Sequence, residues 1–530
     1  MLFRRILEAA LRVRVLVLLV FIGALVGSIS AFRFVDQMFF PSSDRAQFMV
    51  DIWMPEGTSI QTTSEVTRRI ESFVMEQDGV TATSTFVGRG PPRFYLPVEP
   101  ESPNSSYAQL IINTTDGSTV GRVMPVVQAW ADAHVPEAMV IGRRYGLGPF
   151  LSWPVEARIS GPAFADPAVL RSLGEQASSI LAESPHAMAV RTNWREQTPL
   201  IVADYDQTNA RWTGVARTDV AAALRRSHDG TVVGLYREDD KLLPIILRSS
   251  AGDREQGARN LDVLQVRPLL SSRSVPLTQV TSSVGPEWRD PFVFRFNRRR
   301  TIAAQGVPLG FATDYLNDVR AKLEAIEMPP GYTLTIDGEY RSSRDAQKSL
   351  LPGVVPAFII MALVVVGLFN NYRQPLIVLF VVPFALIGVI VGLIVTRQPF
   401  GFVALLGAMS LAGMMVKNAI VLLDEITALQ KQGQAAYDAL VNAAVGRLRP
   451  VLLAAGTTVL GVIPLLADVF WSSLAVVIMF GLAIGSAITM LLVPVLYAML
   501  YRVRPGGPAA ARSRATEPQP DPPDPAVQTA

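Results

Sequence analysis

Six long apolar runs constrain the fold of this 530-residue chain more than any other feature. One lies near the start and five follow residue 349, and each, at about 17 residues or more, is long enough to cross a bilayer as a helix. The runs cover 15–32, 351–369, 376–395, 401–423, 451–467 and 474–500. We therefore predict a membrane α-helical bundle of six transmembrane helices in a 1+5 arrangement, with a large segment of ordinary polarity at 34–347.

The composition agrees with a membrane protein. Half of the residues are hydrophobic and only 18% are charged, whereas about 25% is usual in soluble domains. The net charge of +3 is too small to indicate a nucleic-acid partner. The absence of cysteine excludes disulfides and thiolate metal sites. We expect contact with membrane lipid and none with nucleic acid.

Basic residues indicate on which side of the membrane each loop lies. They gather at 4–14, at Arg373, at 431–449 and at 502–504, all on one side of the predicted spans, and Arg397 lies on the other. Cytoplasmic loops carry an excess of Lys and Arg, so both termini should be cytoplasmic and 34–347 should lie outside the cytoplasm. A cleaved signal peptide is the alternative for the first run, but the five later runs favour a helix.

Between the first and second runs, short strand patterns alternate with helical ones. Three strand–helix–strand units are predicted at 47–87, 107–144 and 154–194, and Ser59 is placed to cap the first helix. The third unit resumes after an insertion at 197–285, with a strand at 292–301, a helix at 311–326 and a strand at 332–337. These units predict a large α+β domain of ferredoxin-like βαβ subdomains, with helices on one face of each sheet.

The sequence shows no arrangement for covalent or hydrolytic chemistry. It has no G-x-S-x-G turn, no phosphate-binding loop and no histidines at metal-ligand spacing. The basic run Arg298–Arg300 is more simply a solvated strand end than a ligand contact. We therefore expect neither an enzyme nor a bound metal or cofactor.

Lys417 is a charge in an unexpected place, because it lies well inside the fourth apolar run. At about 1.5 Å per residue it is about 24 Å from Gly401 and about 12 Å from Glu425. A lysine near the bilayer centre costs at least ~2.5–3.5 kcal/mol and must face the bundle and meet an anion. The six runs hold no acidic residue at this depth, so the simplest source of the anion is another polypeptide. The alternative is that Lys417 snorkels or is neutral.

The fifth run contributes further polar groups. Arg447 and Arg449 precede it, and a helix extended inward over 438–449 would carry Arg447 below the headgroups. Thr457 and Thr458 lie about three turns further along. Their hydroxyls could hydrogen-bond across helices or to their own helix backbone, and the sequence does not decide between these.

With these features the chain resembles a member of the RND (resistance–nodulation–division) superfamily, specifically the C-terminal half of a hydrophobe/amphiphile efflux transporter. One span, a large loop and five spans form the repeat unit of that family. The stretches 413–425, 447–453 and 461–465 are similar to the membrane part of its second repeat. The stretches 39–45, 55–57, 86–90, 234–238 and 275–277 are similar to its periplasmic part. The resemblance covers about 1–504.

The resemblance implies roles for particular residues. Lys417 matches the lysine that pairs with aspartates of the first repeat, and those aspartates are absent from this chain. Arg447 matches an assisting arginine, and the assisting threonine falls at Ala454, so Thr457 or Thr458 would have to replace it. The implied proton relay is Lys417, Asn418, Arg447, Thr457 and Thr458. The implied substrate loop is Phe86, Gly88, Arg89 and Gly90, and the alternative is a plain turn after a strand.

The resemblance also implies a function and partners. The chain would be a half-subunit of a proton-motive-force-driven multidrug/amphiphile efflux pump, a secondary active transporter of the bacterial inner membrane with a periplasmic domain. It would use the proton gradient and no cofactor. Its partners would be an N-terminal RND half carrying the relay aspartates, a periplasmic adaptor, an outer-membrane channel and an amphiphilic small molecule, assembled as a trimer of paired halves.

The implied division of the chain follows the spans. It comprises a first transmembrane helix with cytoplasmic N-terminus (1–33), periplasmic porter subdomains (34–196), a docking-type insertion (197–285), the second part of the porter subdomains (286–347), a five-helix transmembrane bundle (348–504) and a disordered cytoplasmic tail (505–530).

Other interpretations remain open at this point. A membrane-anchored periplasmic binding or scaffolding protein explains the large domain but not Lys417. A protein-export accessory subunit shares the 1+5 topology but should carry an acidic residue where Lys417 stands. A homodimer would bring two lysines together without a carboxylate, and an inactive fragment would need no partner.

Overall fold

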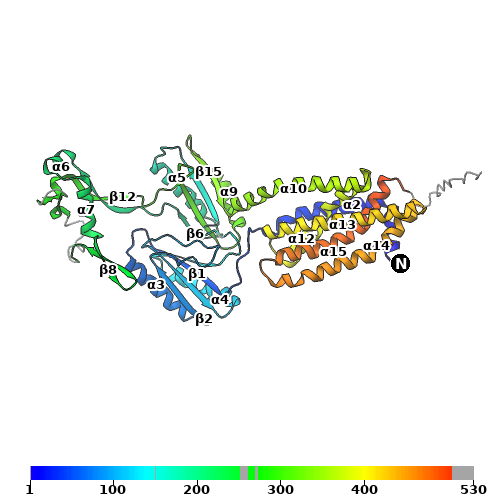
Figure 1. Cartoon of the computed structure of the whole chain (residues 1–530), viewed down its shortest axis with the longest axis horizontal. Coiled ribbons are helices and arrows are strands. Elements are labelled where there is room, and N and C mark those ends of the chain that lie inside the picture. The colour runs from blue at the N-terminus through cyan, green and yellow to red at the C-terminus, as the bar shows by residue number, and fades with distance from the viewer. Residues whose placement is uncertain (1, 150, 251–260, 269–272, 504–530) are drawn as a thin grey trace, which may run out of the picture.

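The computed structural model describes residues 2–149, 151–250, 261–268 and 273–503. The molecule is elongated, with a helical bundle at one end, two sheet-containing subdomains side by side beyond it and a smaller lobe at the far end (Figure 1). The predicted tail at 505–530 lies outside the described residues.

Within the described residues, six helical stretches are long and apolar enough to cross a membrane, as the hydropathy predicts. They are α2 (Arg14–Ala31), α10 (Glu339–Phe369), α11 with α12 (Arg373–Val381 and Ala385–Thr396), α13 (Phe402–Lys431), α14 (Ala436–Val462) and α15 (Ser472–Leu500). The third stretch passes through a 3₁₀ turn at Pro383, because proline has no N–H to continue the α-helical ladder. Helix α14 begins at Ala436, which confirms the predicted inward extension over 438–449.

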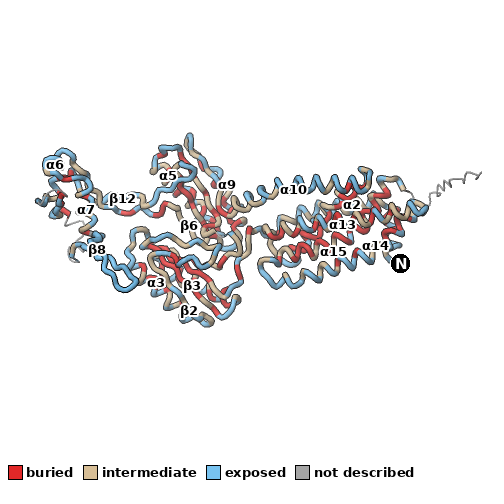
Figure 2. The backbone as a smooth tube through the Cα atoms, in the orientation of Figure 1, coloured by how far each residue is buried: buried red, intermediate tan, exposed pale blue. Residues whose placement is uncertain are grey.

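Helix α15 is the centre of the bundle. It packs against α12, α13 and α14 and is buried along most of its length, whereas α10 and α14 are largely exposed (Figure 2). Two glycine pairs have the GxxxG spacing that allows helices to pack closely: Gly388/Gly392 on α12 and Gly481/Gly485 on α15. A Cβ on Gly388 would lie 2.6 Å from the Phe480 carbonyl oxygen, and one on Gly481 would lie 2.2 Å from Leu411. Helices α12 and α15 therefore meet nearly backbone to backbone at Gly388, and the Leu411 side chain of α13 fills the space over Gly481.

The first apolar helix packs on the outside of this bundle against α12 and α15, and none of its residues is buried. Arg14 Nη1 donates to the carbonyl oxygens of Ala498 (3.0 Å) and Val503 (3.1 Å), and Phe21 packs edge-on against Phe384. A separate helix that the sequence did not predict, α1 (Leu2–Arg12), precedes it and packs against α14 and α15. These contacts favour a transmembrane helix over a cleaved signal peptide.

The first two predicted units form one antiparallel sheet. It consists of β1 (Gln47–Trp53), β2 (Val80–Val87), β3 (Tyr107–Thr114) and β4 (Met139–Arg144) in the order β2-β3-β1-β4. Helices α3 (Ile60–Met75) and α4 (Gly117–His134) cover one face, because alternate residues such as Val50 and Leu110 point into the core beneath them. Ser59 caps α3 as predicted, since its Oγ accepts the Thr62 N–H at 3.2 Å.

The third unit and its continuation form a second sheet with the same ferredoxin-like order. Strands β5 (Val155–Ser160), β6 (Ala187–Thr192), β14 (Arg299–Pro308) and β15 (Thr333–Gly338) run in the order β6-β14-β5-β15, and β13 (Arg295–Phe296) extends β14 as a hairpin. Helices α5 (Pro167–Ala182) and α9 (Ala312–Glu324) cover one face. Leu170, Ile302 and Leu316 lie in the core between them.

The predicted strand at 292–301 is wrong. The chain turns at Asn297 and Arg298, whose φ angles are +51° and +67°, and Phe296 then pairs with Arg299. A two-residue hairpin turn of this kind requires positive φ at both positions. The sequence resembled a continuous strand, because the apolar residues before the turn and the basic residues after it contain no glycine or proline to mark a turn.

The lobe between β6 and β14 has its own small core. It contains α6 (Gln207–Thr213), α7 (Arg217–His228), the hairpin of β8 (Thr231–Glu238) and β9 (Lys241–Leu247), and the short strands β10 (Gln265–Val266) and β11 (Val275–Pro276). A two-stranded ribbon of β7 (Thr198–Tyr205) and β12 (Thr281–Arg289) joins it to the second sheet (Figure 1).

Helix α10 connects the second sheet to the bundle directly. It begins at Glu339, immediately after β15 and well before the apolar run that starts at residue 351. Gly338 has φ +79°, and a Cβ there would lie 2.2 Å from the Pro154 carbonyl oxygen, so glycine is required at this junction. One helix therefore runs from the sheet through the bundle.

Candidate functional site

Lys417 lies on an uncovered face of α13. Val416 and Asn418 on either side are buried, whereas Lys417 is exposed together with Ser410, Gly413 and Asp424. Their spacing of three, four and seven residues places them on one stripe of the helix. Among the described residues, Lys417 has no hydrogen bond or ion pair. The chain therefore presents a cation at mid-helix depth without its counter-ion.

Asn418 lies in the interior of the bundle. Its Nδ2 donates to Ser486 Oγ on α15 at 3.2 Å, and both side chains are buried. Consecutive residues of a helix lie about 100° apart, so Asn418 links α13 to α15 while Lys417 faces away. The structure does not bring these two predicted relay residues together.

Arg447 already has a carboxylate partner within the chain. Its Nε lies 3.0 Å from Glu425 Oε2 on α13, and its Nη2 contacts the same oxygen. The pair is about one-third exposed. Sequence reasoning treated Glu425 only as a residue at the cytoplasmic end of α13. The sequence could have indicated this pair, because Glu425 follows the fourth apolar run and Arg447 precedes the fifth, so both lie on the same side of the membrane.

The Arg447–Glu425 pair shows which residues of α14 lie at the same membrane depth as Lys417. Lys417 lies eight residues before Glu425 on α13, and Ala455 lies eight residues after Arg447 on α14. Because the two helices are antiparallel, both residues are about 12 Å from the ion pair in the same direction. Ala454 and Ala455 are therefore at the level of Lys417. Where the resemblance places a threonine, this chain has an alanine.

Thr457 and Thr458 bond to their own helix. Both hydroxyls donate to the Ala454 carbonyl oxygen, at 3.0 Å and 2.9 Å. These are the backbone contacts that the sequence left as one of two alternatives. Among the described residues, neither hydroxyl bonds across helices.

The predicted substrate loop is tied closely to its own sheet. Gly88 has φ +82°, its N–H donates to the Tyr107 carbonyl at 2.8 Å, and its carbonyl accepts from Asn104 at 2.9 Å. A Cβ on Gly90 would lie 2.7 Å from the Glu101 nitrogen. Phe86 is half-buried within β2, and Arg89 is exposed. Local backbone geometry alone therefore requires glycine at 88 and disfavours a side chain at 90.

A cluster that the sequence analysis missed lies where the two sheets meet. The Arg191 guanidinium from β6 lies between two indole rings, 4.2 Å from the centre of Trp53 and 4.1 Å from that of Trp153. Trp53 belongs to the first sheet, and Trp153 directly precedes the second. Burial, with the nearby Arg195 charge second, lowers the pKa of Arg191 to about 9, so the group is still cationic at neutral pH.

Arg195 extends this cluster across the same junction. Its Nη2 donates to the Met54 carbonyl at 2.6 Å, and its Nε lies 3.4 Å from Glu56 Oε2. Burial raises the pKa of the Glu101 carboxyl above its usual value, although the charges of Arg191 and Arg195 oppose the rise. Two arginines thus tie the sheets together through aromatic, carbonyl and carboxylate groups.

The first sheet holds a second buried polar group beside this junction. Asp51 is completely buried and accepts hydrogen bonds from Tyr107 Oη at 2.7 Å and Gln109 Nε2 at 2.6 Å. It also forms an ion pair with Arg143 of β4. The described residues hold no group of three or more His, Cys, Asp or Glu side chains that could share a metal ion.

Comparison with known families and proteins gives consistent matches. The family described as AcrB/AcrD/AcrF matches residues 1–501. The nickel and cobalt resistance protein CnrA of Cupriavidus metallidurans is 24% identical over 93% of this chain and 47% of its own length. The nickel-cobalt-cadmium resistance protein NccA of Alcaligenes xylosoxydans xylosoxydans is 25% identical over 90% of this chain and 46% of its own length.

The cobalt-zinc-cadmium resistance protein CzcA of Cupriavidus metallidurans is 25% identical over 63% of this chain and 32% of its own length. A crystal structure of a heavy metal efflux pump superposes with a TM-score of 0.76 at 21% identity, covering 94% of this chain and 52% of that one. The chain thus spans about half the length of the relatives CnrA and NccA. The names of these relatives refer to metals, so they give no support to the predicted multidrug or amphiphile cargo.

Proposed function

The chain belongs to the AcrB/AcrD/AcrF family of RND efflux transporters, and from this premise we propose that it supplies one half of a proton-driven efflux pump of the bacterial inner membrane. Members of the family are multi-pass inner-membrane transporters rather than enzymes. The observation that carries the proposal is Lys417, which is exposed at mid-helix depth and has no anionic partner among the described residues.

A second polypeptide would supply the missing anion. A lysine at this depth costs at least ~2.5–3.5 kcal/mol unless it meets a carboxylate, and the relatives CnrA and NccA are about twice as long as the matched segment. We propose a partner half with aspartates in the helix that covers the Lys417 face of α13. Ser410 and Gly413 on that face are small residues, which allows a partner helix to approach closely.

Proton movement would drive the cycle. Protonation of the partner's aspartate would weaken its attraction for Lys417 and shift α13 relative to the partner. Each proton moving inward supplies ~2.3 kcal/mol per 100 mV of membrane potential. In the described structure Arg447 is held by Glu425, so we propose that it joins the relay by exchanging this partner. Asn418 would hold α13 in register with α15 through Ser486. Thr457 and Thr458 would take part only by exchanging their bonds to the Ala454 carbonyl for bonds to a partner helix.

Heavy-metal cations are the first cargo class to test, because the relatives are nickel, cobalt, zinc and cadmium resistance proteins. A second candidate, an organic amphiphile, is favoured by a specific observation. Arg191 and Arg195 pack against Trp53, and Arg191 also packs against Trp153, at the junction of the sheets, so cargo would reach them only if the sheets move apart. Arginine repels metal cations, whereas arginine and indole groups together suit an organic anion.

The roles of the segments outside the membrane are proposed from their positions in the chain. We propose porter subdomains at 34–196 and 286–347, with the loop at Phe86, Gly88, Arg89 and Gly90 near the cargo path, and a docking-type insertion at 197–285. RND pumps generally form trimers and work with a periplasmic adaptor and an outer-membrane channel, and we propose the same partners here.

The test is transport by cells that express the chain together with the partner isolated with it. Lys417→Ala should abolish efflux of both nickel and a fluorescent amphiphile while the protein still accumulates in the membrane. Lys431→Ala is the matched control, because it removes an exposed lysine from the cytoplasmic end of the same helix. Full transport by Lys417→Ala would overturn the proposal and would favour a scaffolding role.

A further inference from the structure

Basic residues line the outer end of α10, where few are expected. Arg341, Arg344 and Lys348 are spaced by three and four residues and so lie on one face of the helix. They stand directly before the apolar run at 351–369, on the side that the proposed orientation places outside the cytoplasm. Lys and Arg near membrane spans concentrate on the cytoplasmic side, so any cation of this stripe that the chain itself does not pair needs an anion from elsewhere.

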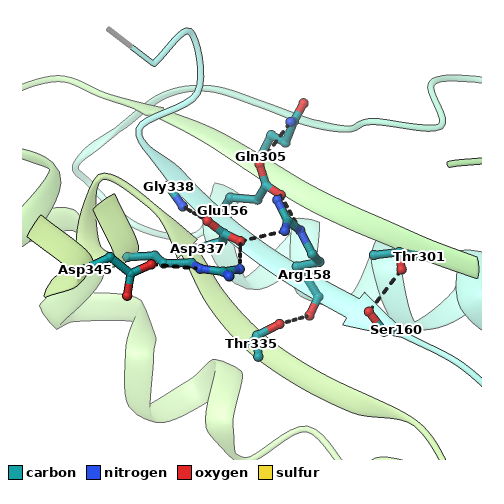
Figure 3. Close-up of polar contacts among 10 residues, drawn as sticks. Glu156, Arg158, Ser160, Thr301, Gln305, Thr335, Asp337, Gly338 and Asp345 are labelled. Carbon is teal, nitrogen blue, oxygen red and sulfur yellow. Dashed lines mark hydrogen bonds and ion pairs between the residues drawn. The ribbon is translucent and has the colours of Figure 1, made fainter. Parts of the chain in front are cut away.

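The stripe opens onto a cavity of about 400 Å³ between α10 and the second sheet. Figure 3 shows the polar floor beside it, where side chains of β5, β15 and α10 are joined by ion pairs. Arg158 binds Glu156 at 2.8 Å and Asp337 at 2.7 Å. Arg341 binds Asp337 at 2.9 Å and Asp345 at 3.4 Å (Figure 3). The carboxylates of the floor are therefore already paired with arginines.

Other cations of the cavity lack a carboxylate. Arg299 is held by the carbonyl oxygens of Gly161 and Gly331, at 2.7 Å and 2.6 Å. Arg344 and Lys348 are exposed and have no hydrogen bond or ion pair among the described residues. The cavity and its floor thus carry two more positive charges than negative ones, counted from Arg158, Arg299, Arg341, Arg344 and Lys348 against Glu156, Asp337 and Asp345.

An apolar stripe continues the basic one into the membrane. Leu351, Val355 and Ile359 follow Lys348 at helical spacing, and each is more than half exposed, at 56%, 52% and 55%. A ligand that fits both stripes has an anionic head and a long apolar tail. Free phosphate would use the cations only.

We propose that the outer end of α10 binds the phosphate of an anionic phospholipid headgroup in the outer leaflet, with Arg344 and Lys348 as its cationic ligands and Leu351, Val355 and Ile359 along an acyl chain. Arg299 adds positive potential to the cavity without leaving its carbonyl partners. The bound lipid would hold the junction between the second sheet and the bundle against the membrane surface. This inference needs only the proposed orientation of the chain, not the proton relay.

The test measures lipid retention by the full chain in nanodiscs of mixed phosphatidylglycerol and phosphatidylcholine. Native mass spectrometry should show phosphatidylglycerol bound in preference to phosphatidylcholine. In the double variant Arg344→Gln/Lys348→Gln this preference should fall about twenty-five-fold, about fivefold for each cation near an anionic lipid surface. Arg68→Gln/Lys322→Gln is the control, because it removes two exposed cations from α3 and α9 and should change nothing.

Two outcomes would overturn the inference. One is a preference in the Arg344→Gln/Lys348→Gln variant within threefold of the parent. The other is loss of bound phosphatidylglycerol from the parent in excess inorganic phosphate, which would show a free-phosphate site. If the double variant does not fold, the exchange Arg344→Lys/Lys348→Arg, which keeps both charges, should retain the preference and its loss would contradict the assignment.

Discussion

Replacing Asp51 should strongly destabilise the first sheet. Asp51→Ala removes the carboxylate from Arg143, whose side chain is only 11% exposed, and removes the acceptor of Tyr107 and Gln109. Breaking one side of a buried ion pair costs about 3–5 kcal/mol, and a buried donor left without an acceptor costs about 1–3 kcal/mol more. The expected loss is about 5 kcal/mol, because such costs are not additive.

Thermal unfolding of the purified chain, followed by tryptophan fluorescence, measures this loss. Trp53 is a local reporter, because its ring centre lies 4.4 Å from that of Tyr107. At about 2–4 °C per kcal/mol for domains of 150–250 residues, the midpoint should fall by about 10–20 °C. The double variant Asp51→Leu/Arg143→Met removes both charges and should recover at least about 2 kcal/mol. A loss below about 1 kcal/mol in Asp51→Ala, or no recovery in the double variant, would refute the reasoning.

Three further predictions concern packing, the Arg447 pair and pH. Gly388→Ala forces a Cβ against the Phe480 carbonyl and should cost about 1–3 kcal/mol in thermal unfolding, whereas Gly367→Ala, which meets open space, should cost nothing measurable. Glu425→Gln should cost at most about 1 kcal/mol, because the pair with Arg447 is about one-third exposed; a larger fall in midpoint would show a buried pair. Glu101→Gln should stabilise the chain at pH 7, because burial raises the folded-state pKa of Glu101 and so disfavours its ionised form. That gain should shrink as the pH falls through the raised pKa and vanish below about pH 4.3, and a gain that persists at low pH would contradict the assignment.

Local patterns in the sequence predicted the helices and most strands, because these depend on periodicity along the chain. The apolar runs predicted the spans, and Ser59 was correctly predicted as a helix cap. The hairpin at Asn297 was missed because the turn depends on backbone angles that no periodicity encodes. The early start of α10 was missed for a related reason, since polar residues before 351 hid a helix that begins outside the membrane.

The site was predicted less completely than the fold. Depth along one helix identified Lys417, because the cost of a charge in a membrane depends on position alone. The Arg447–Glu425 pair and the Arg191 cluster join residues far apart in the sequence, and the contacts that define them exist only in the folded chain. The predicted amphiphile cargo was drawn from a family resemblance, and the relatives that match carry metals in their names.

The central claim is that another polypeptide covers the Lys417 face of α13, and photo-crosslinking tests it most directly. A benzophenone amino acid at Gly413 would stand on that face, where nothing lies within 4 Å of an added Cβ. The same probe at Gly367 of α10 is the control, since that position is equally open. We predict that irradiation joins position 413, and not 367, to a second membrane protein with an aspartate in the crosslinked helix. Crosslinks at 413 only to lipid, or only to another copy of this chain, would contradict the account.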